Sequence, residues 1–130
     1  MTSPGQTLSV LIADDHDLFA ASLAELLARE GLDVVGRATH GAEAVALASR
    51  LRPDVVVMDV SMPCCDGIEA TREITGTLET TRVVMLTGIN DLEVSLRARA
   101  AGATAYVIKG SSFDELLTAI RAPVTLAPAS

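Results

Sequence analysis

Short apolar runs alternate along the chain with longer stretches in which apolar residues recur every three or four positions. The short runs occupy residues 8–13, 34–35, 55–58, 83–86 and 105–108. Runs of this length without polar alternation are typical of strands buried on both faces, whereas the longer spacing is typical of amphipathic helices. The pattern therefore predicts five β-strand–α-helix units in succession, which form an α/β domain with a parallel sheet between two layers of helices.

Helix-capping residues indicate where several of these helices begin and end. The apolar stripe of the first helix consists of Leu18, Phe19, Leu23, Leu26 and Leu27. We expect this helix to end at Gly31, because glycine readily takes the left-handed conformation that closes a helix. Asn90 and Glu93 have capping-box spacing and predict the start of the fourth helix. Ser112 and Glu115 have the same spacing and predict the start of the fifth.

The chain has 130 residues, enough for one domain with its own core. We expect the folded domain to span residues 8–122, after a disordered lead-in at 1–7 and before a tail or interdomain linker at 123–130. No apolar run approaches the roughly 20 residues that span a bilayer, and the start lacks the basic and apolar regions of a secretory signal. The sequence therefore predicts a cytoplasmic protein with no membrane segment.

The charge balance and the few reactive side chains exclude other function classes. Ten basic against seventeen acidic residues give a formal net charge of −7, which disfavours direct binding of nucleic acid. Cys64 and Cys65 are adjacent and are expected to be free thiols in a reducing compartment. We expect His16 to be a solvated residue at the start of the first helix, and His40 to lie in a loop with no assigned role.

Polar side chains directly follow four of the five predicted strands. Asp14 and Asp15 follow the first strand, Asp59 the third, Thr87 the fourth and Lys109 the fifth. The carboxyl ends of parallel strands meet at one edge of an open sheet, where ligands bind. Any one of these residues alone would be interpreted as a helix cap or a solvated side chain. Their joint placement instead predicts a single polar site.

The chemistry of this residue set favours phosphoryl transfer. Three carboxylates held together repel one another unless a cation offsets them, and Mg²⁺ prefers oxygen ligands of this kind. Lys109 supplies a positive charge suited to a phosphoryl oxygen, and Thr87 supplies a hydroxyl donor. An aspartate nucleophile in such surroundings is suited to forming an aspartyl phosphate.

Four segments at these strand ends resemble the receiver domains of two-component response regulators. They are ADDH at 13–16, MDVSMPCCDG at 58–67, LTG at 86–88 and YVIK at 106–109. The D-x-x-M-P-x-x-D-G pattern is specific in this context, and the resemblance extends over residues 8–121. It implies a flavodoxin-like, doubly wound sheet of five parallel strands in the order 2-1-3-4-5 with five helices.

The resemblance also implies roles for the site residues. Asp59 would accept the phosphoryl group, and Mg²⁺ would be held by Asp14, Asp15, Asp59 and the backbone carbonyl of Ser61. Asp15 would coordinate the ion directly, and Asp14 mainly through a water molecule.

Further along the chain, the resemblance implies a conformational switch. Thr87 and Lys109 would contact the phosphoryl oxygens, and Tyr106 would change rotamer on activation as the Thr87 hydroxyl is drawn toward the phosphoryl group. The chain departs from many receivers in that Gly110, not proline, follows Lys109, so no cis Lys–Pro bond exists here.

The implied function is a signalling switch that receives its phosphoryl group from a sensor histidine kinase and is not an enzyme in the ordinary sense. Several details resemble the subfamily that precedes a helix-turn-helix DNA-binding domain, and the acidic surface permits a homodimer.

A haloacid-dehalogenase-type phosphatase is disfavoured, because residues 59–61 lack its D-x-D signature. A flavodoxin-type cofactor binder is disfavoured because the chain has no Trp to stack on a flavin. A phosphorylation-independent pseudo-receiver that acts as a protein-binding module stays open as the alternative.

Overall fold

The computed structural model describes residues 7–62, 67–88 and 90–122, which form five parallel strands and five helices in strict alternation. The strands are β1 (Ser9–Ala13), β2 (Asp33–Ala38), β3 (Val55–Asp59), β4 (Arg82–Thr87) and β5 (Ala105–Ile108). The helices are α1 (Asp17–Arg29), α2 (Gly41–Leu51), α3 (Gly67–Thr77), α4 (Leu92–Ala100) and α5 (Phe113–Arg121). The strand order is β2-β1-β3-β4-β5, which confirms the predicted fold.

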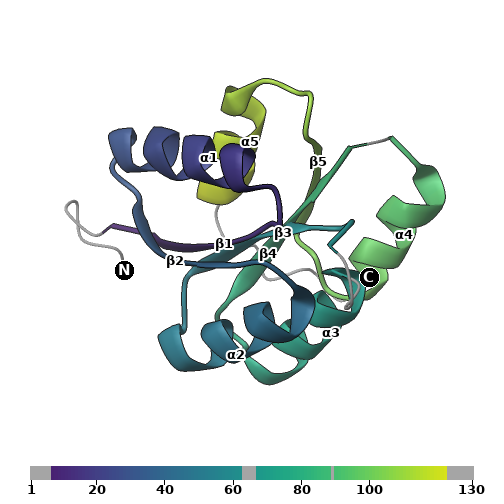
Figure 1. Cartoon of the computed structure of the whole chain (residues 1–130). Helices are drawn as coiled ribbons and strands as arrows, with labels where there is room; N and C mark the ends of the chain where they lie inside the picture. The colour runs from purple at the N-terminus through teal and green to yellow at the C-terminus, as the bar shows by residue number, and fades with distance from the viewer. Residues whose placement is uncertain (1–6, 63–66, 89, 123–130) are drawn as a thin grey trace.

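Two apolar layers sandwich the sheet. Helices α1 and α5 cover one face, while α2, α3 and α4 lie against the other (Figure 1). Alternate residues of each central strand face opposite layers, so Val57 packs toward α1 and α5 and Met58 toward the opposite helices. Every residue of β3 is buried, as expected for a continuous apolar strand covered on both faces.

The edge strand β2 is longer than the sequence pattern indicates. Only Val34 and Val35 were predicted as strand, but pairing with β1 continues from Asp33 to Ala38. Gly36 and Arg37 interrupt the apolar run, and both residues are partly exposed at the edge of the sheet. An edge strand needs less apolar surface than a central one, so its true length was not evident.

The predicted apolar stripe of α1 is partly wrong. Leu18 is 78% exposed and Leu26 is 39% exposed. The residues that this helix buries are Ala20, Leu23 and Leu27, spaced three and four apart. Leu18 and Leu26 therefore lie beside the buried face and not within it. The predicted C-terminal residue is confirmed, because Gly31 has a φ of +86° just after the helix.

The cap of α4 also differs from the prediction. Its N-cap residue is Asp91, whose carboxylate accepts hydrogen bonds from the backbone N–H groups of Glu93 and Val94. The predicted Asn90 lies one residue too early. Ser112 is the N-cap of α5 and accepts from the Glu115 N–H, as predicted.

Both histidines lie at helix starts. His16 is the exposed N-cap residue of α1, in agreement with the prediction. His40, predicted to lie in a loop, is the N-cap of α2, where its Nδ1 accepts from the Glu43 N–H at 3.2 Å. Residues 1–6 and 123–130, and both Cys64 and Cys65, lie outside the described residues. Within the described part of the chain, no helix is both long enough and apolar enough to cross a membrane.

Candidate functional site

The carboxyl edge of the sheet gathers the side chains that the sequence singled out. Asp14 follows β1, Asp59 ends β3, Thr87 ends β4 and Lys109 follows β5. Asp14 and Asp59 are buried, with 1% and 3% of their surface exposed, whereas Asp15 is exposed. Carboxylate oxygens of the three aspartates lie within 4.8 Å of one another. The structure thus forms one acidic cluster from two strand ends that are 45 residues apart in sequence.

Asp14 is held tightly by its neighbours. Its backbone N–H donates to the carbonyl of Ala38 on β2 at 2.9 Å, and its Oδ1 accepts from the His16 N–H at 2.9 Å. The other carboxylate oxygen, Oδ2, is buried and accepts no well-directed hydrogen bond from the described residues. It lies 2.9 Å from the ammonium nitrogen of Lys109, with which it forms an ion pair.

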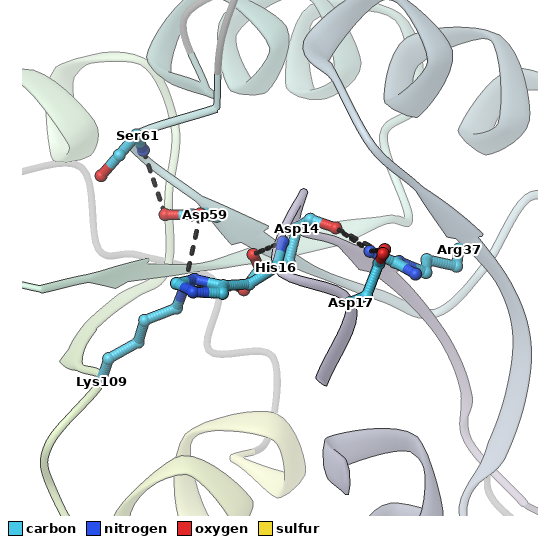
Figure 2. A network of polar contacts seen from close by, with 7 residues as sticks. All are labelled: Asp14, His16, Asp17, Arg37, Asp59, Ser61 and Lys109. Atoms are coloured by element: carbon cyan, nitrogen blue, oxygen red, sulfur yellow. Dashed lines mark hydrogen bonds and ion pairs between the residues drawn. The ribbon is translucent and has the colours of Figure 1, made fainter. Parts of the chain in front are cut away.

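Lys109 lies between the two buried carboxylates (Figure 2). Its Nζ is 2.9 Å from Asp14 Oδ2 and 3.4 Å from Asp59 Oδ2, and it also lies 4.6 Å from the centre of the Phe19 ring. Burial favours the neutral amine, but the adjacent carboxylates of Asp14 and Asp59 outweigh it and raise the pKa of Lys109. The ammonium therefore stays charged at neutral pH.

The surroundings of Asp59 shift the pKa of its carboxyl group. Its Oδ1 accepts a hydrogen bond from the backbone N–H of Ser61 at 3.0 Å. Burial, aided by the charge of Asp14, raises the pKa of Asp59, while the Ser61 hydrogen bond and the Lys109 charge oppose the rise. The ammonium of Lys109 therefore does not fully offset the burial of Asp59 and the charge of Asp14 beside it.

The residues fit a hard divalent cation. Asp14 presents a buried carboxylate oxygen that only an ion pair satisfies, and Asp15 brings an exposed carboxylate to the same point. Carboxylate and carbonyl oxygens are the ligands that Mg²⁺ prefers. An open hollow of about 330 Å³ gives access from solvent, and it is lined by Asp15, His16, Asp59, Ser61, Gly88 and Lys109.

Gly67 lies directly against the backbone of Asp59. A Cβ atom at this position would overlap the backbone carbonyl oxygen of Asp59. The glycine of the D-x-x-M-P-x-x-D-G pattern therefore lets the start of α3 approach the end of β3 closely.

The remaining predicted site residues lie on the face of the sheet that α3 and α4 cover. Thr87 is buried, and it projects to the same face as Met85, two residues earlier on β4. Tyr106 on β5 is opposite Met85, is half-buried, and packs against that same layer. Its hydroxyl lies 3.5 Å from the carbonyl oxygen of Asp91 at the start of α4. Thr87 and Tyr106 therefore share one side of the sheet.

Two residues next to the cluster were missed by the sequence reasoning. The guanidinium of Arg37 on β2 donates to the backbone carbonyl of Asp14 and to the carboxylate of Asp17 (Figure 2). The ring of Phe19 on α1 lies beneath the ammonium of Lys109. A prediction of strand as far as residue 38 would have placed Arg37 at this edge. Phe19 was predicted only as part of the apolar stripe of the first helix.

Comparison with known proteins is decisive for the family. The family model described as the response regulator receiver domain matches residues 10–121. This chain is a response regulator receiver domain. The resemblance inferred from the strand-end motifs is thereby confirmed.

Individual relatives of this receiver domain are transcriptional regulators. It is 45% identical over 116 residues to the transcriptional regulatory protein PdtaR of Mycobacterium tuberculosis, covering 89% of this chain and 56% of that protein. The chain thus spans about half the length of the curated relatives it matches.

Solved structures share the fold closely. A two-component response regulator of the LuxR family from Aurantimonas sp. SI85-9A1 superposes with a TM-score of 0.84 at 36% identity, covering 88% of this chain and 83% of that one. A response regulator from Burkholderia pseudomallei superposes with a TM-score of 0.81 at 25% identity, covering 88% of this chain and 67% of that one. That second crystal structure contains a phosphorylated aspartic acid, a calcium ion and citrate.

Proposed function

We propose that this receiver domain is a phosphorylation-activated signalling switch that accepts a phosphoryl group on Asp59 from a sensor histidine kinase in a Mg²⁺-dependent reaction. The observation that carries the proposal is the setting of Asp59. Its buried carboxylate adjoins two further aspartates and lies 3.4 Å from the ammonium of Lys109, and Asp59 lines an open hollow. The phosphorylated aspartic acid in the Burkholderia pseudomallei regulator supports the same chemistry here.

The transfer is a nucleophilic substitution at phosphorus. A carboxylate oxygen of Asp59 attacks the phosphorus of a phosphohistidine, the new P–O bond forms as the P–N bond breaks, and the imidazole leaves with the electron pair. The Lys109 ammonium interacts with the charged phosphoryl oxygens, and the Thr87 hydroxyl donates to one of them.

The metal would be held by the carboxylates of Asp14, Asp15 and Asp59 and by the backbone carbonyl of Ser61. When bound, Mg²⁺ supplies positive charge that offsets both the acidic cluster and the phosphoryl oxygens. The buried Oδ2 of Asp14, with no well-directed hydrogen bond from the described residues, supports this assignment.

Activation would pass through the shared face of Thr87 and Tyr106. The phosphoryl group draws the Thr87 hydroxyl toward it, and the half-buried Tyr106 ring moves inward into the space released. Such a switch requires two packings that differ by only a few kcal/mol. The surface formed by α4, β5 and α5 would then change its contacts. Helix α4 exposes Leu92 and Leu96 to solvent.

The downstream partner would be a DNA-binding effector domain in a longer regulator, working in the cytoplasm, with the receiver able to pair with a second copy of itself. The relatives are transcriptional regulators about twice as long as the matched segment, and one solved relative is of the LuxR family. The receiver itself carries a net charge of −7, so we assign DNA contact to the partner domain alone.

The test is the intact mass of the protein after incubation with acetyl phosphate and Mg²⁺. Wild type should gain one phosphoryl group, and the gain should disappear with Asp59→Asn or with excess chelator. Asp33→Asn is the matched control, because it makes the same chemical change at an exposed strand residue. No gain in wild type, with acetyl phosphate or with a phosphorylated kinase, would instead favour the phosphorylation-independent binding module.

A further inference from the structure

We propose that Arg37 is a positioning residue for the metal-binding loop, and that it fixes the place of Asp15 through the backbone of Asp14. The inference rests on the proposed function, since it concerns the same Mg²⁺ site. Arg37 belongs to none of the strand-end motifs and comes from the opposite side of the cluster, on the edge strand β2.

Arg37 grips the loop between β1 and α1 at two points. Its Nε and Nη2 atoms donate to the carbonyl oxygen of Asp14 at 3.2 and 3.0 Å. Nη2 also donates to Oδ1 of Asp17, the first residue of α1, at 2.7 Å (Figure 2). A planar guanidinium suits this forked geometry, whereas a lysine ammonium presents a single point of charge.

Both polar groups of the Asp14 backbone are therefore hydrogen-bonded to residues of β2. Its N–H donates to the carbonyl of Ala38, and its C=O accepts from Arg37. The accepting carbonyl belongs to the peptide bond that joins Asp14 to Asp15. Because a peptide unit is planar, fixing its carbonyl also fixes the N–H and Cα of Asp15.

Asp15 needs such support more than its neighbours do. Asp14 and Asp59 have carboxylates that are buried and bonded by backbone N–H groups. No hydrogen bond or ion pair to the Asp15 carboxylate is found among the described residues, and the residue is exposed. Its position beside the other two carboxylates therefore depends on its own backbone, which Arg37 holds.

If Arg37 acted only through its charge, its removal would have the opposite effect on Mg²⁺ affinity. A cation next to a metal site repels the metal, so removing its charge would tighten Mg²⁺ binding, and Arg37→Lys would leave binding unchanged. A positioning role predicts that Arg37→Met and Arg37→Lys both weaken binding. Loss of a residue that orients metal ligands typically costs about tenfold or more in metal affinity.

The experiment is an NMR titration of backbone amide shifts with Mg²⁺ on the full chain, which gives a dissociation constant without any phosphorylation step. Arg29→Met is the matched control, because Arg29 is an exposed residue at the far end of α1 and pairs with Glu25. Its affinity for Mg²⁺ should equal that of wild type. Asp17→Asn, which keeps the contact from Arg37 to the Asp14 carbonyl, should change affinity less than twofold, far below the about tenfold loss expected on removing Arg37.

The outcomes separate this inference from the proposed function. Weaker binding in both Arg37 variants, with Arg29→Met unchanged, supports the positioning role. Unchanged or tighter binding in Arg37→Met overturns it while leaving the Mg²⁺ site intact. A wild-type chain that shows no Mg²⁺-dependent shifts overturns the metal site itself, and with it this inference. Arg37 lies on an edge strand with a side chain one-third exposed, so we expect every variant to fold.

Discussion

The ammonium of Lys109 lies 4.6 Å from the centre of the Phe19 ring, so an aromatic face of α1 supports the cation that links the two buried carboxylates. Asp14 and Asp59 bind the same ammonium at 2.9 and 3.4 Å. The cation is thus held by two carboxylates and by the negative face of a ring. This arrangement fixes a long, flexible side chain beside the proposed phosphoacceptor.

The first prediction concerns that contact. Phe19→Leu keeps an apolar side chain but removes the ring, and it should destabilise the fold more when Lys109 is present than in a Lys109→Met background. The coupling energy should be about 1 kcal/mol, as for a partly desolvated cation–π pair. Urea unfolding of wild type, the two single variants and the double variant measures it. Phe19→Tyr should retain the coupling, and a coupling energy of zero for Phe19→Leu would contradict the contact.

The second prediction concerns Mg²⁺ and stability. A cation that binds only the folded cluster stabilises the fold, and at ten times its dissociation constant the gain is about 1.4 kcal/mol. Thermal unfolding of wild type should therefore shift upward when Mg²⁺ replaces chelator. Asp14→Asn, which removes a buried carboxylate, should reduce the shift, whereas Asp33→Asn at an exposed position should retain it. Coincident melting curves of wild type with and without Mg²⁺ would contradict the acidic site.

The third prediction is a pH dependence traced to Asp59. Burial raises the pKa of Asp59 in the folded state above its ordinary value of 3.8, so the folded state binds the proton more tightly than the unfolded chain. Stability from this group is therefore present at low pH and is lost as pH rises from that ordinary value through the folded pKa. Asp59→Asn does not titrate, so it should be more stable than wild type above that window.

The measurement for Asp59 is the difference in unfolding free energy between Asp59→Asn and wild type, taken in chelator from pH 3 to 8. The difference should grow with pH and then level off, and Mg²⁺ should shrink it at neutral pH. A difference that is independent of pH would show that burial does not perturb this carboxyl. Asp33→Asn, at an exposed site, should show no comparable trend.

The sequence pattern predicted the alternating strands and helices and the acidic cluster because both follow from the backbone, whereas the strand order 2-1-3-4-5 came from the resemblance to receiver domains. Buried strands must be apolar on both faces, and residues that follow parallel strands must meet at one edge. The sequence alone therefore places Asp14, Asp59 and Lys109 together. The remaining features depend on side-chain geometry that periodicity does not contain.

Three differences illustrate that limit. Leu18 and Phe19 are adjacent on a helix and point about 100° apart, so only one of them can contact the sheet side, and the apolar pattern alone cannot choose. Asn90 and Asp91 are both good N-cap residues, and the choice depends on where the first turn starts. Arg37 interrupts an apolar run, so the sequence pattern indicates that the strand ends before it. Pairing with β1 shows instead that β2 continues to Ala38.

The fourth prediction compares two glycines of α3. Gly67 and Gly76 both lie in this helix, but a Cβ on Gly67 would overlap the carbonyl oxygen of Asp59, whereas a Cβ on Gly76 would meet open space. Gly67→Ala should therefore destabilise the fold by about 1–3 kcal/mol, as overpacking does. Gly76→Ala should stabilise it by about 0.5–1 kcal/mol, because alanine is the better helix former.

The two alanine variants should also differ in phosphoryl acceptance. The clash in Gly67→Ala displaces the end of β3, and with it the carboxylate of Asp59 from the ammonium of Lys109. The rate of phosphorylation by acetyl phosphate should fall at least tenfold, a loss of about 1.4 kcal/mol in transition-state stabilisation. Gly76→Ala should react as wild type does. If Gly67→Ala loses stability but reacts at the wild-type rate, the close approach serves packing alone and does not position Asp59.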